Sequence, residues 1–301
     1  MTTAANLTLP ANTGVLLVAH GTVENLDDLG AFVGRIRMGR PAPLGLVEEL
    51  RHRYEAIGGS PLLRTTREQG QALARRLEAP VLVGMRLWDP SVEAALGGAA
   101  ALGLERMIVI ALAPFSQHIY WEATLKSAQA AGTSIELLRT DAWGEEPAFV
   151  AAHAELIQRH AAEHDALSAP VVLSAHSLPR VVVDRGDPYA TLVEASARAL
   201  STLLRSDTQL CFQSQGADGG DWLGPGVRET LTMLSAKGHR KVVWAPFGFL
   251  ADHVETLYDL DIEARGIAQE LSMTLVRVPA LNLHPGLTEA LSAVAIRALS
   301  V

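Results

Sequence analysis

A row of carboxylates in the last third of the chain is the part of the sequence best suited to chemistry. Its members recur at intervals of three or four residues: Asp252, Glu255, Asp259 and Glu263. This spacing predicts one face of a helix, where like charges repel by roughly a few tenths of a kcal/mol per pair. The row is therefore either a solvated acidic face or a path for cations or protons. The apolar segment 245–250 before it favours a buried start, where carboxylates need partners.

A histidine at a predicted strand end is the second candidate. His176 follows the apolar run Val171–Ala175 and precedes a proline-containing turn, so its imidazole should project from the end of the strand. A neutral imidazole, with an ordinary pKa near 6.5, can accept a proton at physiological pH. On the sequence alone, a structural role is an equal alternative. Three other histidines recur at helical spacing and are interpreted as residues of a surface helix without a metal site: His153, His160 and His164.

Short apolar runs separated by longer segments of helical period predict alternating strands and helices. The runs are continuous rather than alternating, which is typical of parallel sheets covered on both faces. The predicted strands are Val15–Ala19, Val81–Met85, Met107–Ala113, Ile135–Leu138, Val171–Ala175, Leu210–Ser214, Val242–Pro246 and Thr274–Val278. The helical patterns include Arg64–Leu77, Ala148–Glu163, Tyr189–Leu204 and Val227–Lys237.

The two halves of the chain also resemble each other. Val15–His20 and Val171–His176 both end in Ala-His, and Ala-Pro-Phe closes the third predicted strand of each half. This repetition predicts a duplicated α/β unit, in which ligands bind at the carboxyl ends of the strands and between the two domains. The boundary is expected near the breaker residues at 168–170. The predicted domains are residues 1–168 and 169–301, each with a four-stranded parallel sheet flanked by helices.

Composition excludes several classes of protein. The 301 residues carry a formal charge of −8, which argues against a nucleic-acid partner. The single cysteine, Cys211, cannot form an internal disulfide or an all-cysteine metal site. The longest apolar run, Ala94–Leu104, is too short for a membrane span, which needs about 20 residues. Because the first residues also lack a signal-peptide pattern, a cytoplasmic location is expected.

Four motifs in order make the chain resemble the ferrochelatase family, whose members insert Fe2+ into a porphyrin. The motifs are Arg53-Tyr-Glu-Ala-Ile-Gly-Gly-Ser-Pro-Leu62, Leu173-Ser-Ala-His-Ser-Leu-Pro179 with Gly186-Asp-Pro-Tyr189, Gln213-Ser-Gln with Trp222-Leu-Gly-Pro225, and Gly248-Phe-Leu-Ala-Asp-His-Val-Glu-Thr-Leu-Tyr258. The resemblance covers nearly the whole chain, from Val15 to about Leu299. It implies two similar Rossmann-like domains with the porphyrin in the cleft between them. Fe2+ and porphyrin are then substrates, with no tightly bound cofactor and no iron–sulfur cluster.

The resemblance also implies roles for particular residues. It makes His176 the catalytic histidine and Glu255 the catalytic glutamate. The expected metal contacts are His176, Glu255, Asp259 and Glu263, the last two passing the metal inward. The expected porphyrin contacts are His20, Arg35, Arg37, Arg40, Tyr54, Ile57, Ser60, Arg86, Trp222 and Phe249. Among these, arginines suit the propionate groups because a guanidinium pairs with a carboxylate through two hydrogen bonds. For Arg35, Arg37 and Arg40 the alternative is a solvated basic loop. Ile57, Trp222 and Phe249 are candidates for apolar walls of the porphyrin site, with ordinary core positions as an equal alternative.

The stretch before Tyr54 bears on the identity of the porphyrin. Residues 35–49 are short and charged, whereas family members that use protoporphyrin IX at membranes carry an apolar lip. This stretch is similar to that of the soluble coproporphyrin III ferrochelatases, and it favours that substrate. In two places the sequence departs from the coproporphyrin III enzymes. His20 stands where those enzymes often have Tyr, and the run 255–263 is more similar to the protoporphyrin enzymes. Protoporphyrin IX therefore stays an alternative substrate. A chelatase for another metal and a non-catalytic porphyrin carrier are further alternatives, and transient contact with neighbouring haem-pathway enzymes is expected.

Overall fold

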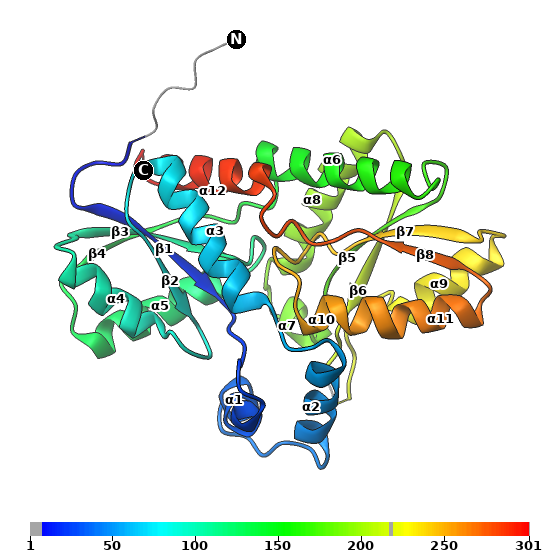
Figure 1. The fold of residues 1–301 in the computed structure, drawn as a ribbon, viewed down its shortest axis with the longest axis horizontal. Coiled ribbons are helices and arrows are strands. Elements are labelled where there is room, and N and C mark those ends of the chain that lie inside the picture. The colour runs from blue at the N-terminus through cyan, green and yellow to red at the C-terminus, as the bar shows by residue number, and fades with distance from the viewer. Residues whose placement is uncertain (1–7, 217–218, 301) are drawn as a thin grey trace, which may run out of the picture. The chain divides into compact units, whose positions relative to one another are not determined.

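The computed structural model describes residues 8–216 and 219–300, which contain two four-stranded parallel sheets flanked by helices (Figure 1). All the predicted strands form, with ends shifted by no more than two residues. The first sheet contains β1 (Thr13–Ala19), β2 (Val81–Met85), β3 (Arg106–Ala111) and β4 (Glu136–Arg139). The second contains β5 (Val171–His176), β6 (Thr208–Gln213), β7 (Lys241–Ala245) and β8 (Thr274–Arg277).

The two sheets share one topology. Their strand orders are β2-β1-β3-β4 and β6-β5-β7-β8, so the first strand of each half is paired on both sides. The Ala-His sequences therefore stand at equivalent places, at the carboxyl ends of β1 and β5. This identity of topology confirms the duplicated α/β unit predicted from the sequence.

Helices cover the first sheet on both faces (Figure 1). On one face, α4 and α5 pack together over a core that includes Leu16, Leu96 and Met107. On the other face, α3 packs against both β2 and α12, the last helix of the chain. The helices of this part are α3 (Leu62–Leu77), α4 (Val92–Ala101), α5 (Gln117–Ala131) and α12 (Pro285–Arg297).

The second sheet carries the segments that build the candidate site. A π-helix, η2 (Asp259–Ala264), buries Leu260 and Ala264 in a core with Trp244 of β7 and Leu231 of α9. The other helices are α1 (Leu29–Ile36), α2 (Leu46–Ala56), α6 (Pro147–Glu163), α7 (Arg180–Asp184), α8 (Tyr189–Leu204), α9 (Val227–Ala236), α10 (Val254–Leu257) and α11 (Arg265–Glu270), with a 3-10 turn, η1, at Leu26–Asp28.

The described residues divide into two compact units, and the chain passes between them more than once. The first unit contains the segment up to Val23, Leu62–Phe149 and the segment from Leu283 onward. The second contains Glu24–Pro61 and Val150–Asn282. The division of the chain at residues 168 and 169 stays a prediction.

One expectation about α6 is wrong. His153 is only 2% exposed, and its ring lies 6.3 Å from that of Phe247. The helical spacing was interpreted as a solvated face, but α6 is largely apolar and buries the side of the helix that carries His153. Among the described residues, no helix is both long enough and apolar enough to cross a lipid bilayer.

Candidate active site

His176 is the last residue of β5, in the second unit. Its Nδ1 lies 2.5 Å from the carbonyl oxygen of Ser177, and the Tyr189 hydroxyl donates to the carbonyl of His176 at 2.8 Å. Because a carbonyl oxygen can only accept, Nδ1 carries the proton in the neutral imidazole. The lone pair is therefore on Nε2, which faces Glu255 at 3.6 Å. The backbone thus holds His176 ready to accept a proton at Nε2.

Glu255 lies between two imidazoles rather than beside one. Its Oε1 faces His176, and its Oε2 lies 3.5 Å from Nε2 of His253. The Nδ1 of His253 lies 3.1 Å from the carbonyl of Ala251, so this second imidazole has the same tautomer as His176. One carboxylate therefore accepts from whichever Nε2 is protonated.

The sequence analysis assigned no role to His253. On a helix, residues two apart do not share a face. His253, however, is the extended N-cap of α10, with φ −160°, and in an extended segment the side chains of residues i and i+2 point the same way. The signal that could have revealed it is the pair His253 and Glu255 at a helix start rather than within a helix.

The three side chains shift one another's pKa values. Burial lowers the pKa of both imidazoles, but the Glu255 carboxylate, the backbone carbonyls of Ser177 and Ala251 and a nearby aspartate together raise the pKa of both above the ordinary value. Burial favours the neutral form of Glu255, yet the charges and hydrogen bonds of His176 and His253 hold its pKa well below the usual range. The ionised carboxylate therefore stabilises the imidazolium that forms when either histidine accepts a proton.

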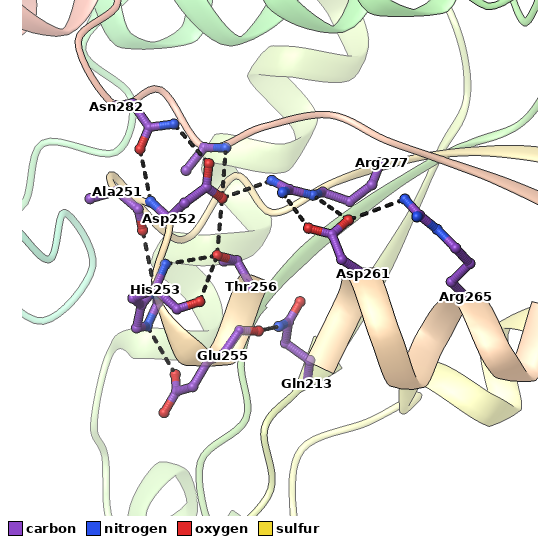
Figure 2. Close-up of polar contacts among 11 residues, drawn as sticks. Gln213, Ala251, Asp252, His253, Glu255, Thr256, Asp261, Arg265, Arg277 and Asn282 are labelled. Carbon is purple, nitrogen blue, oxygen red and sulfur yellow. Dashed lines mark hydrogen bonds and ion pairs between the residues drawn. The ribbon is translucent and has the colours of Figure 1, made fainter. Parts of the chain in front are cut away.

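Asp252 does not belong to the acidic row, and the expectation that it shares a helix face with the other carboxylates is wrong. Figure 2 shows its carboxylate turned toward Arg277 of β8, at 2.7 Å. Asn282 also donates to it at 2.8 Å, and the Thr256 hydroxyl donates at 3.0 Å. Arg277 reaches Asp261 of η2 as well, at 2.5 Å. Asp252 precedes α10, and this network binds it to the sheet.

Asp259 and Glu263 both lie on η2 and share one arginine. Arg53 of α2 lies 3.0 Å from Asp259 and 3.4 Å from Glu263. The second oxygen of Asp259 accepts from the Ser214 hydroxyl at 2.5 Å. Ser214 adopts a left-handed backbone, with φ 59°, a conformation that is uncommon outside glycine and that clusters at functional sites. A cavity of about 160 Å³ is lined by these four side chains together with Gln215, Val227, Ala264 and Ile267.

The contribution of Asp259 to the free energy of unfolding depends on pH. Burial and the charge of Glu255 raise its pKa from 3.8 to about 6, against the opposing effects of Ser214 and Arg53. The folded protein therefore binds this proton more tightly than the unfolded chain does. The stabilisation is complete below pH 3.8 and is lost as the pH rises through 6.

Replacing Asp259 by asparagine removes this titration. Relative to wild type, the free energy of unfolding of Asp259→Asn is expected to be higher at pH 8 than at pH 4.5 by about 2 kcal/mol. Urea unfolding at both pH values measures the difference. Glu263→Gln is the control, because Glu263 contacts the same arginine but is largely exposed. If Asp259→Asn changed the free energy of unfolding equally at the two pH values, the raised pKa of Asp259 would be contradicted.

The structure places the predicted porphyrin residues in both units. Arg35 and Arg40 are exposed around the loop between α1 and α2, Arg37 is half-buried, and Tyr54 is buried. Ile57, Ser60 and Trp222 are half-buried, and Phe249 packs its ring 5.3 Å from that of His253. His20 and Arg86 belong to the first unit, where His20 is exposed and the Arg86 guanidinium lies over the ring of Tyr120 at 5.5 Å. Their roles stay predictions.

The predicted metal contacts do not form a single closed set of ligands. Within residues 8–216 and 219–300, no three or more His, Cys, Asp or Glu side chains are grouped so as to hold a metal ion. The physical reason is that the two oxygens of Glu255 face separate imidazoles, and those of Asp259 face Ser214 and Arg53. The four predicted residues therefore form two adjacent pairs, His176 with Glu255 and Asp259 with Glu263.

The fold is shared with chelatases of known structure. The structure of the sirohydrochlorin chelatase SirB from Bacillus subtilis subspecies spizizenii, in complex with cobalt, superposes with a TM-score of 0.55. The match covers 96% of this chain and 95% of SirB at 16% identity. CbiX, described as the terminal enzyme of sirohaem biosynthesis in denitrifying bacteria, gives the same TM-score at 14% identity. These likenesses define a chelatase fold.

The sequence comparisons define a narrower class of protein than the fold does. The sequence model of the ferrochelatase family matches residues 12–299. A ferrochelatase from Acidobacterium capsulatum is 36% identical over 93% of both chains. A coproporphyrin III ferrochelatase from Geobacillus kaustophilus is 33% identical over 94% of this chain and 95% of the relative. The chain belongs to the ferrochelatase family, as its four motifs indicated.

Proposed function

We propose that this protein inserts Fe2+ into a porphyrin, with coproporphyrin III as the favoured substrate. The observation that carries the proposal is the arrangement of His176 and His253 around Glu255, with each Nε2 facing one carboxylate oxygen. Membership of the ferrochelatase family supports the same reaction. Fe2+ and the porphyrin are both substrates, and the proposal includes no tightly bound cofactor.

The geometry suits the proton balance of the reaction. A free-base porphyrin carries two pyrrole N–H protons, and both must leave before four nitrogens can hold the iron. The lone pair on Nε2 of His176 takes the first proton, and the resulting imidazolium is stabilised by the ionised Glu255. His253 offers a second Nε2 to the same carboxylate. The pair of imidazoles can thus pass protons away from the macrocycle one at a time.

The carboxylates of Asp259 and Glu263 are placed where they could receive the metal. Aqueous Fe2+ must lose its water, and carboxylate and imidazole ligands can replace that water stepwise. Asp259 and Glu263 stand one and two helical turns beyond Glu255, so they form the proposed path inward. In the structure Arg53 is paired with both of them. A cation that binds there must first separate these carboxylates from the guanidinium.

The segment between α1 and α2 supports coproporphyrin III. It carries Arg37 and Arg40, whose Nε atoms donate to backbone carbonyls of the same loop, and Arg35 lies just before it. A substrate with four propionates gains more from such cations than one with two. Several relatives of similar identity are named coproporphyrin III ferrochelatase. The cytoplasmic location and the transient contact with neighbouring haem-pathway enzymes remain parts of the proposal.

The test is anaerobic Fe2+ insertion by the purified protein into coproporphyrin III and into protoporphyrin IX. We expect kcat/KM to be about tenfold higher for coproporphyrin III, since each exposed arginine–propionate pair contributes up to about 1 kcal/mol. The preference should shrink in Arg40→Met, whereas Arg139→Met, on β4 of the first unit, should leave it unchanged.

The other outcomes separate the alternatives. Faster turnover of protoporphyrin IX would overturn the argument from the charged segment and leave the chelatase intact. Tight porphyrin binding without insertion would identify a carrier instead. Insertion of Co2+ but not Fe2+ would identify a chelatase for another metal, because imidazole and carboxylate ligands do not select iron by affinity.

A further inference from the structure

We propose that Gln213 is a positioning residue that holds Glu255 opposite His176, an inference that rests on the proposed function. Gln213 is the last residue of β6 and pairs with His176 in the register of the parallel sheet. Its side chain is 1% exposed. The polar amide is therefore buried at the edge of the sheet from which His176 projects.

Gln213 contacts both sides of the His176–Glu255 pair. Its backbone oxygen accepts from the N–H of Ser177, the residue after the histidine, at 2.7 Å. Its side-chain Nε2 donates to the carbonyl oxygen of Glu255 at 2.6 Å, a contact that Figure 2 shows. One residue thus links the end of β5 to the first turn of α10. These segments are far apart in sequence and meet through hydrogen bonds to the same glutamine.

The orientation of the Gln213 amide is fixed from its other end. Its Oε1 accepts from the Ser174 hydroxyl at 2.6 Å, and the oxygen of that hydroxyl accepts from the indole N–H of Trp244 at 2.9 Å. Because the Ser174 proton is directed to Oε1, the amide has its NH2 group toward Glu255. Ser174 and Trp244 are completely buried, so water cannot replace these bonds.

The Gln213 amide also lies close to the hydroxyl that binds Asp259. Nε2 of Gln213 lies 3.5 Å from the Ser214 hydroxyl oxygen, and that hydroxyl donates to Asp259. The chain of bonds from Trp244 therefore ends at both Glu255 and Asp259. Loss of the glutamine amide should release the Glu255 backbone while the porphyrin contacts remain in place.

The test uses Gln213→Met, which keeps the length of the side chain and removes both polar groups. We expect kcat for iron insertion to fall about 10- to 100-fold, with KM for the porphyrin within about twofold of wild type. Gln117→Met is the matched control, because Gln117 is an equally buried glutamine of the first unit whose amide accepts from the N–H of Ala111 and donates to the carbonyl of Val109, without any link to Glu255. It should lower the melting temperature at least as much and keep kcat within about twofold.

A crystal structure of Gln213→Met gives a readout that does not depend on activity. We expect the Glu255 carboxylate to move away from its 3.6 Å separation from Nε2 of His176. An unchanged separation, or a kcat loss no larger than in Gln117→Met, would overturn the inference. If wild type inserts iron into neither porphyrin, the proposed function fails, and the crystallographic separation still decides the role of Gln213. Should Gln213→Met not fold, Gln213→Asn, whose amide is one methylene too short to span both partners, replaces it.

Discussion

Alanine at position 176 is expected to lower kcat for iron insertion by about 10²- to 10⁴-fold, the usual contribution of a positioned general base. The imidazole is the one base whose Nε2 faces Glu255 from the end of β5, and its tautomer is set by the carbonyl of Ser177. His253 remains in His176→Ala, but it projects from the start of α10 and cannot occupy the same place. Single-turnover insertion measured by the change in porphyrin absorbance isolates this chemical step.

A matched histidine elsewhere provides the control. His160 on α6 also faces a carboxylate at 3.6 Å, that of Glu163. His160→Ala removes the same kind of pair and should leave kcat within about twofold of wild type. Equal losses in the two variants would show that His176 acts through stability alone, and a His176→Ala enzyme with normal kcat would remove it from the mechanism.

The largest expected effect on stability is at Arg277. Its guanidinium is paired with both Asp252 and Asp261, and its side chain is 11% exposed. Arg277→Met leaves Asp252 without its cation in a largely buried place and leaves Asp261 with only the exposed Arg265, which should cost about 3–5 kcal/mol of unfolding free energy. Urea unfolding at pH 7 measures the loss.

Arg265 provides the comparison, because it pairs with the same Asp261 at 3.3 Å but is 50% exposed. An exposed pair contributes about 1 kcal/mol at most, so Arg265→Met should change the unfolding free energy by less than that. Similar losses of unfolding free energy in the two variants would mean that the burial of Arg277 and its bond to Asp252 do not add to stability.

The fold was predictable because its strands are continuous apolar runs and because the duplicated Ala-His endings mark equivalent positions. His176 was found for the same reason, since side chains at the carboxyl ends of parallel strands are available to ligands. These inferences rest on local patterns, which a single sequence displays. The order of the strands within each sheet was not predicted, because it depends on which strands pair across the chain.

The parts that could not be predicted depend on contacts between distant residues. Arg53 and Asp259 are separated by 206 positions, and no local pattern links them. Asp252 fits the helical spacing of the acidic row, but a competing partner on β8 fixes it elsewhere. Gln213 stood in a family motif without a role, because a buried amide acquires meaning only once both of its partners are placed. The π-helix at Asp259–Ala264 likewise has no signature in the residue spacing.

The path of the chain has a consequence for its synthesis. The helix α12 packs against α3 and β3, although those elements precede it by some 200 residues. Its buried side includes Leu287, Leu291 and Val294. A ribosome therefore releases nearly the whole second unit before the first can cover that face of its sheet. The apolar surface that α12 covers therefore stays exposed until translation is nearly finished, and exposed apolar surface of this kind favours aggregation of incomplete chains.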